Sequence, residues 1–83
     1  MQLVYFAWVR EMVGTDAETL APPADVITVA ALLDWLAGRS DGHAAALADR
    51  KRIRVAVDQQ FAGPDTPLDG ATEIAIFPPV TGG

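Results

Sequence analysis

The stretch "TVAALLDWLA" (Thr28–Ala37) predicts the main helix of the chain and decides its fold class. Its apolar residues recur at spacings of three and four, so they share one face of an α-helix. Thr28 is a favourable N-cap residue, and Gly38 follows as a helix stop. The apolar stripe consists of Val29, Leu32, Leu33 and Leu36. A helix with one apolar face has to pack on another layer, and the segments on both sides of it favour strands.

Two segments before the helix predict strands. "QLVYFAWV" (Gln2–Val9) is rich in β-branched and aromatic residues and predicts the first strand, followed by a helical turn at Arg10–Val13. "ETLAPP" (Glu18–Pro23) predicts a short second strand, which its two prolines end.

Two more strands are predicted after the helix. "RIRVAVDQQF" (Arg52–Phe61) alternates apolar with charged or small residues, and "TEIAIF" (Thr72–Phe77) does the same. A short second helix is expected at His43–Asp49. The order strand, strand, helix, strand, strand predicts a sheet with one main helix packed on one face, which is an α+β domain. We expect a single domain over residues 1–77 and a flexible tail over residues 78–83.

The composition limits what this chain can do. Its 83 residues leave room for one small core, and a hydrophobic content of 51% suits a folded globule. A net charge of −5 argues against nucleic acid and anionic membranes as partners. The absence of cysteine excludes disulfides, thiol nucleophiles and thiolate metal sites. With no signal peptide and no apolar run of about 18 residues, the sequence predicts a soluble cytoplasmic protein.

The alternation along the strands assigns side chains to two faces. One set is wholly apolar and should face the helix. The other set contains polar residues (Gln2, Arg54 and Glu73) and large aromatic ones as well. The aromatic residues expected on this outer face are Phe6, Trp8 and Phe77, with Phe61 beside them. Aromatic side chains gathered on one exposed face predict a docking patch, and ordinary scattered surface residues are the competing interpretation.

The chain ends in a segment that predicts a chemical role. The tail consists of Pro78, Pro79, Val80, Thr81, Gly82 and Gly83. The prolines cannot continue a sheet ladder and stiffen the segment, whereas the glycines lack a Cβ and fit a narrow channel. Its one reactive group is the carboxylate of Gly83, which ATP-driven adenylation would open to attack by sulfur or an amine. An inert chain end is the competing interpretation.

Three segments resemble the MoaD family, the small sulfur-carrying subunits of molybdopterin synthase. They are "FAWVREMVGTD" (Phe6–Asp16), "TVAALLDWLA" (Thr28–Ala37) and "FPPVTGG" (Phe77–Gly83). The match extends in order over essentially the whole chain. Its tail motif is quite specific, although Gly-Gly alone is shared by all ubiquitin-like carriers. The resemblance implies a ubiquitin-like β-grasp fold with a mixed sheet.

The resemblance also implies a reaction. An E1-like, ATP-using enzyme would adenylate the Gly83 carboxylate, which would become a thiocarboxylate. The tail would then enter the active site of a large, catalytic subunit and donate sulfur to a cyclic pyranopterin precursor of the molybdenum cofactor. This chain would be the non-catalytic sulfur carrier of a heterotetrameric sulfurtransferase, would bind no cofactor or metal itself, and would leave ATP to its partner. The family's contact surface corresponds to Phe6, Phe61 and Phe77.

Some residues depart from the family or receive no role. Asp58 stands where the family often has Asn, and the region around residue 50 is more basic than the family leads us to expect. The basic residues are Arg50, Lys51, Arg52 and Arg54, which we interpret as solvated. His43, the only histidine, is interpreted as a surface or capping residue rather than a catalytic one.

Other functions remain open at this point. The chain could carry sulfur for thiamine synthesis or tRNA thiolation, since these relatives share the terminal Gly-Gly. It could also be a protein modifier joined to lysines, or a β-grasp binding module whose tail is inert.

Overall fold

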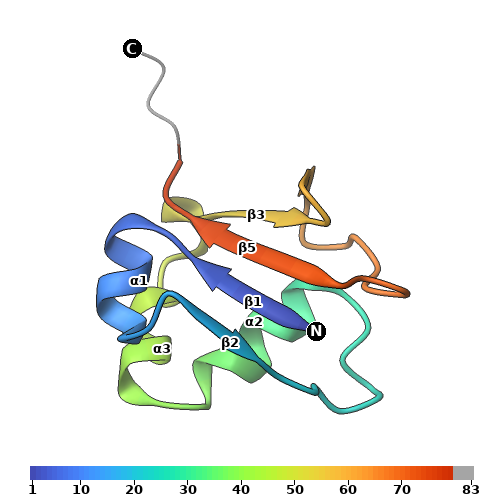
Figure 1. Ribbon diagram of the computed structural model, residues 1–83, viewed down its shortest axis with the longest axis horizontal. Coiled ribbons are helices and arrows are strands. Elements are labelled where there is room, and N and C mark those ends of the chain that lie inside the picture. Colours follow the sequence, from blue (N-terminus) through green and yellow to red (C-terminus); the bar gives the residue numbers. More distant parts are fainter. Residues whose placement is uncertain (80–83) are drawn as a thin grey trace.

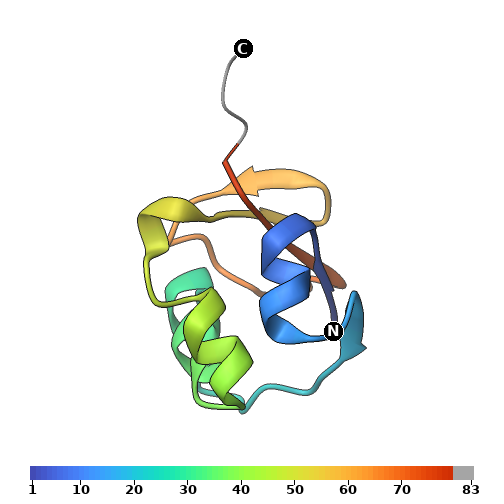
Figure 2. The ribbon, with the colours of Figure 1, turned by 90° about the vertical axis from the view of Figure 1, so that its left-hand side faces the viewer.

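A computed structural model describes residues 1–79 of the chain as a mixed five-stranded sheet with helices on one face (Figures 1 and 2). The strands lie in the order β2-β1-β5-β3-β4, and the central pair β1 and β5 is parallel while the other pairs are antiparallel. The strands are β1 (Gln2–Tyr5), β2 (Ala17–Thr19), β3 (Arg54–Val57), β4 (Gln60–Ala62) and β5 (Glu73–Phe77). The helices are α1 (Ala7–Val13), α2 (Val29–Ala37), α3 (Asp41–Ala46) and a 3₁₀ turn, η1 (Arg50–Arg52).

Helix α2 confirms the prediction for Thr28–Ala37. The Thr28 hydroxyl accepts a hydrogen bond from the Ala31 amide at 3.2 Å, and Gly38 follows the last helical residue. All four residues of the apolar stripe are buried in the core. Burial of one such side chain contributes about 1.5–3 kcal/mol, so this stripe supplies much of the contact between helix and sheet.

The predicted faces of the central strands are also confirmed. Leu3 and Tyr5 of β1 pair with Ile74 and Ile76 of β5 in register, and all four are buried under the helices. This apolar layer is completed by Val55 in β3 and by Ile53, which precedes β3. The sheet therefore has one face in the core, and its even-numbered β1 residues lie on the other face.

The first strand is shorter than predicted. It ends at Tyr5, and Ala7 then adopts a positive φ of 53° and begins helix α1. Gly14 ends this helix in the left-handed conformation, with a φ of 96°. The uninterrupted apolar run hides this boundary because it contains no Gly, Pro or polar cap before Ala7. Trp8 consequently lies on a helix, and its predicted place on the outer strand face is wrong.

The segment predicted as one strand over Arg52–Phe61 is a hairpin. Asp58 and Gln59 both have a positive φ and turn the chain from β3 into β4. The Asp58 carboxylate accepts hydrogen bonds from the amides of Glu73 and Thr72 and from the Thr72 hydroxyl, at 2.8–3.0 Å. These bonds lower the pKa of Asp58, and the bond from the Glu73 amide has the largest effect. Asp and Asn both tolerate a positive φ, which explains an acidic residue in this position.

The two remaining predictions need small corrections. Strand β2 covers only Ala17–Thr19, and helix α3 begins at Asp41 after the N-cap residue Ser40, whose hydroxyl accepts from the His43 amide. No helix among residues 1–79 has the length and apolar character that crossing a bilayer requires.

Candidate functional site at the end of strand β5

The end of β5 is where the chain leaves the sheet towards its C-terminus (Figure 1). Because Tyr5 pairs with Ile76 in parallel, β1 ends at the same end of the sheet as β5. The Phe6 amide donates to the Ile76 carbonyl at 3.1 Å. On the other side, Arg54 at the start of β3 pairs with Phe77. Three segments that are distant in sequence therefore surround the chain where it leaves the domain.

Two exposed phenylalanines and one half-buried phenylalanine lie beside this exit. We call Phe6, Phe61 and Phe77 the aromatic patch. Phe61 and Phe6 are 81% and 47% exposed, and phenylalanine is more often buried. The rings of Phe61 and Phe77 have their centroids 5.9 Å apart, and together with Arg54 they line a shallow pocket. A partner side chain could enter this pocket, and the role of the aromatic patch in binding stays a prediction.

Trp8 does not belong to the aromatic patch. It is half-buried on α1, packs against the core, and has the Arg52 guanidinium 5.1 Å from the centroid of its ring. Trp8 would therefore affect an interface by positioning Arg52 and not by presenting an exposed ring face to a partner.

The predicted reactive tail lies mostly outside the described residues. Pro78 and Pro79 are half-buried where the chain leaves β5, and residues 80–83 lie outside the described residues. Four residues span at most about 14 Å when fully extended. If Gly83 reacts as predicted, a partner that acts on it would therefore have to contact the surface around the exit.

No group of three or more His, Asp or Glu residues within residues 1–79 is arranged to hold a metal ion.

The interpretation of His43 as a surface or capping residue is wrong in one respect, because its side chain is buried, with 7% of the residue exposed. Its Nε2 lies 2.7 Å from Glu18 Oε2, and its Nδ1 lies 2.7 Å from the Ser40 hydroxyl. The Tyr5 hydroxyl donates to the same Glu18 oxygen at 2.7 Å.

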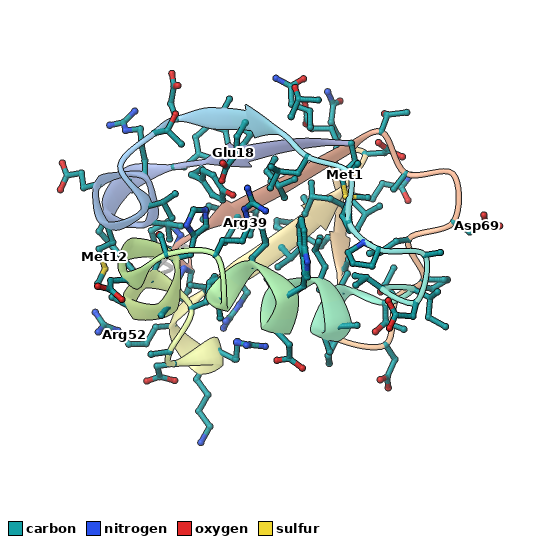
Figure 3. The ribbon with its side chains drawn as sticks, turned by 90° about the horizontal axis from the view of Figure 1, so that it is seen from below. Met1, Met12, Glu18, Arg39, Arg52 and Asp69 are labelled. Carbon is teal, nitrogen blue, oxygen red and sulfur yellow. The ribbon has the colours of Figure 1, made fainter. Side chains whose placement is uncertain are left out.

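This network joins β1, β2 and α3. Figure 3 shows Glu18 between the sheet and the helices, with Arg39 close by. The residues that meet here are 13 and 25 positions apart in the chain, and no local pattern links them. A polar residue at the centre of an apolar segment, such as Tyr5, is the one sequence signal that could have indicated it. We infer that this network stabilises the fold, because each of its polar side chains forms a hydrogen bond with another member of the network.

The network predicts an acid-sensitive contribution to folding. Burial acts to raise the pKa of Glu18, but the hydrogen bonds from Tyr5 and His43 outweigh it and lower that pKa below its ordinary value of 4.5. The contribution is therefore fully present above pH 4.5 and is lost as the pH falls through the lower pKa of the folded state. We expect Glu18→Gln to lower the free energy of unfolding by about 1–2 kcal/mol near pH 7 and by much less near pH 3.

Urea unfolding of the wild type and of Glu18→Gln at both pH values measures this difference. Asp25→Asn removes an equal charge from an exposed position and serves as the control. An equal loss of stability at the two pH values would contradict the assignment.

Comparison with known proteins identifies the family and supports the fold. Residues 3–83 match the ThiS family. The Escherichia coli protein named "Molybdopterin synthase sulfur carrier subunit" is 48% identical over 83 residues, covering 100% of this chain and 99% of that protein. The Haemophilus influenzae protein of the same name is 36% identical, with the same coverage of 100% and 99%.

A solved structure also resembles this chain over its full length. The crystal structure of SAMP1 from Haloferax volcanii superposes with a TM-score of 0.74 at 28% identity, covering 100% of this chain and 98% of that one. The predicted ubiquitin-like β-grasp fold is confirmed.

Proposed function

Because the chain belongs to the ThiS family of sulfur carriers, we propose that it is the sulfur carrier subunit of a molybdopterin synthase. One observation carries this proposal, namely the 48% identity, over the full length of both chains, to the Escherichia coli protein of that name. The aromatic patch around the chain exit supports it because a carrier has to dock against the proteins that load and unload its tail.

The proposed chemistry takes place at the Gly83 carboxylate. A carboxylate oxygen attacks the α-phosphorus of ATP on an E1-like partner, which gives an acyl-adenylate and releases pyrophosphate. A sulfur nucleophile then displaces AMP and leaves a thiocarboxylate. On the large subunit, that sulfur passes to a cyclic pyranopterin precursor, and water restores the carboxylate. No step needs a side chain of this protein, which is consistent with a chain that has no cysteine.

The surface around the exit supports docking in both steps. Tail insertion brings the partner against Phe6, Phe61 and Phe77, and their exposed ring area would be buried there. A few aromatic side chains in the desolvated centre of an interface each contribute about 2 kcal/mol or more to binding. We therefore assign the large subunit and the E1-like enzyme as partners. ATP belongs to the E1-like enzyme, the complex with the large subunit is a heterotetramer, and both reactions occur in the cytoplasm.

Purification from cells of the source organism tests this assignment. An N-terminal affinity tag suits the experiment because Met1 lies far from the exit of β5 (Figure 1). We expect the tagged carrier to co-purify with the large subunit of molybdopterin synthase. Co-purification with a thiazole synthase or a tRNA-thiolating enzyme alone would reassign the carrier. A ladder of covalent conjugates to other proteins would instead show a protein modifier.

A further inference from the structure

The connection between β1 and α1 contains a residue in an unfavourable backbone conformation. Ala7 has a φ of 53°, in the left-handed region that glycine adopts readily and alanine does not. Phe6 before it is extended, with a φ of −126° and a ψ of 152°. The chain therefore passes from strand to helix within a single residue, and the surrounding structure has to hold that residue in place.

The end of β1 is fixed on the strand side of this connection. The Tyr5 side chain is buried, and the Tyr5 amide donates to the Asp16 carbonyl at 2.9 Å. The Phe6 amide donates to the Ile76 carbonyl at 3.1 Å. These bonds hold the last residue of β1 and the residue after it between β5 and the segment that leads into β2.

Helix α1 is fixed on the other side of the connection. Val9 is fully buried in the core. A Cβ added at Gly42 would meet the Met12 carbonyl oxygen, so α3 lies directly against α1. Neither the strand nor the helix can shift without losing these contacts, which explains why the positive φ of Ala7 persists.

The conformation of Ala7 decides which aromatic ring lies at the surface near the chain exit. A strand that continued beyond Tyr5 would place Phe6 and Trp8 on the same outer face. The turn at Ala7 instead packs Trp8 against the core and leaves Phe6 exposed. Helix α1 begins near the end of β5, where the chain leaves the sheet (Figure 1). The direction of the Phe6 ring at this place therefore depends on the backbone of Ala7.

We propose that Ala7 is a positioning residue, whose left-handed conformation holds the Phe6 ring in the direction in which a partner buries it. This inference rests on the proposed function, because it needs Phe6 to lie in the docking surface. Glycine would adopt the same φ at no cost, but it would also adopt many others. Alanine is held in one narrow region, so the ring is oriented before binding and less conformational freedom is lost on docking.

The variant Ala7→Gly of the full-length carrier tests this proposal with the large subunit of molybdopterin synthase from the same organism. Ala7 is exposed, so the substitution removes little packing. We expect the Kd measured by isothermal titration calorimetry to rise about fivefold, because the Phe6 ring then has to be ordered on binding. The urea midpoint should not fall, since relief of the unfavourable φ offsets the added freedom of the unfolded chain.

D-Alanine at position 7, introduced by chemical synthesis of the chain, is the conservative replacement. A D-residue favours positive φ, so it keeps the methyl group and stabilises the observed backbone. This variant should bind within about twofold of the wild type, and its urea midpoint should rise.

A double-mutant cycle with Phe6→Ala shows whether Ala7 acts through the ring. Phe6→Ala alone should weaken binding. Addition of Ala7→Gly to that variant should change the Kd by less than about twofold, because no ring remains to be positioned. A general disturbance of the surface would instead cause the same loss with and without the ring.

Gln59→Gly is the matched control. Gln59 also has a positive φ, of 71°, and is exposed. It lies at the opposite end of the sheet from the chain exit, since it follows β3, whose last residue Val57 pairs with Ile74 near the start of β5. This substitution should leave the Kd within about twofold of the wild type.

The outcomes separate this inference from the proposed function. If the wild type does not bind the large subunit, the proposed function and this inference both fail. If the wild type binds, the inference alone fails when Ala7→Gly binds equally well, when Phe6→Ala has no effect, or when the loss persists without the ring. A loss of affinity with D-alanine, or a fall in the urea midpoint that accompanies the loss for Ala7→Gly, would also overturn it.

Discussion

Deletion of Gly82 and Gly83 should abolish molybdopterin production and leave the domain folded. Every core side chain of the described residues lies before Pro78, so we expect the free energy of unfolding to change by no more than about 0.5 kcal/mol. The terminal carboxylate, in contrast, then belongs to Thr81, which has a branched side chain, and the tail is about 7 Å shorter. Molybdopterin formed by the purified synthase in the presence of the precursor should fall to background.

A one-residue extension provides the complementary variant. Appending a single alanine after Gly83 moves the carboxylate by about 3.6 Å and adds a Cβ to the narrowest part of the tail. A displacement of 1 Å can cost about 100-fold in rate, so this variant should also be inactive. Undiminished production by an extended chain, with the extra residue verified by its mass, would refute a role for the chain end.

The second large effect is expected at the aromatic patch. Phe61→Ala should weaken binding to the large subunit about 30-fold, which corresponds to about 2 kcal/mol for an aromatic side chain in the centre of an interface. Because Phe61 is 81% exposed in the free protein, the same substitution should cost less than about 1 kcal/mol of folding stability. Isothermal titration calorimetry and urea unfolding measure the two quantities.

Ile27→Ala is the matched control for this prediction. Ile27 is also a large exposed apolar residue, with 64% exposure, but it lies beside Met1 and away from the chain exit. Its truncation should leave the affinity unchanged within about twofold. Equal losses for the two variants would mean that the aromatic patch is not the docking surface.

The elements that the sequence predicted well are those in which apolar residues recur at a regular spacing. Thr28–Ala37 combines a cap, an apolar stripe and a stop, and all three are present in α2. The alternation in Thr72–Phe77 likewise predicted that Ile74 and Ile76 face the core. The alternation assigned Phe6 and Phe77 to the outer face, whereas Phe61 was added from its place at the end of the predicted strand and from the family resemblance, and their shared role in binding stays a prediction.

The elements that it missed depend on backbone conformation or on distant contacts. A positive φ at Ala7 ends the strand within an apolar run and moves Trp8 onto a helix, and residues with positive φ divide the next predicted strand into β3 and β4. None of these positive-φ positions is a glycine, the residue that would have indicated such a conformation in the sequence. The burial of His43 depends on Glu18, 25 residues earlier, and only the folded chain brings them together.

The central claim is that the reactivity of this protein resides in its terminal carboxylate, and intact mass spectrometry tests it most directly. The carrier is incubated with ATP, the E1-like enzyme and a sulfur donor, and its mass is measured before and after. Exchange of one terminal oxygen for sulfur should add about 16 Da, located at Gly83 by fragmentation, and omission of ATP should prevent it. A carrier whose mass stays unchanged, or which gains sulfur elsewhere in the chain, would contradict the account.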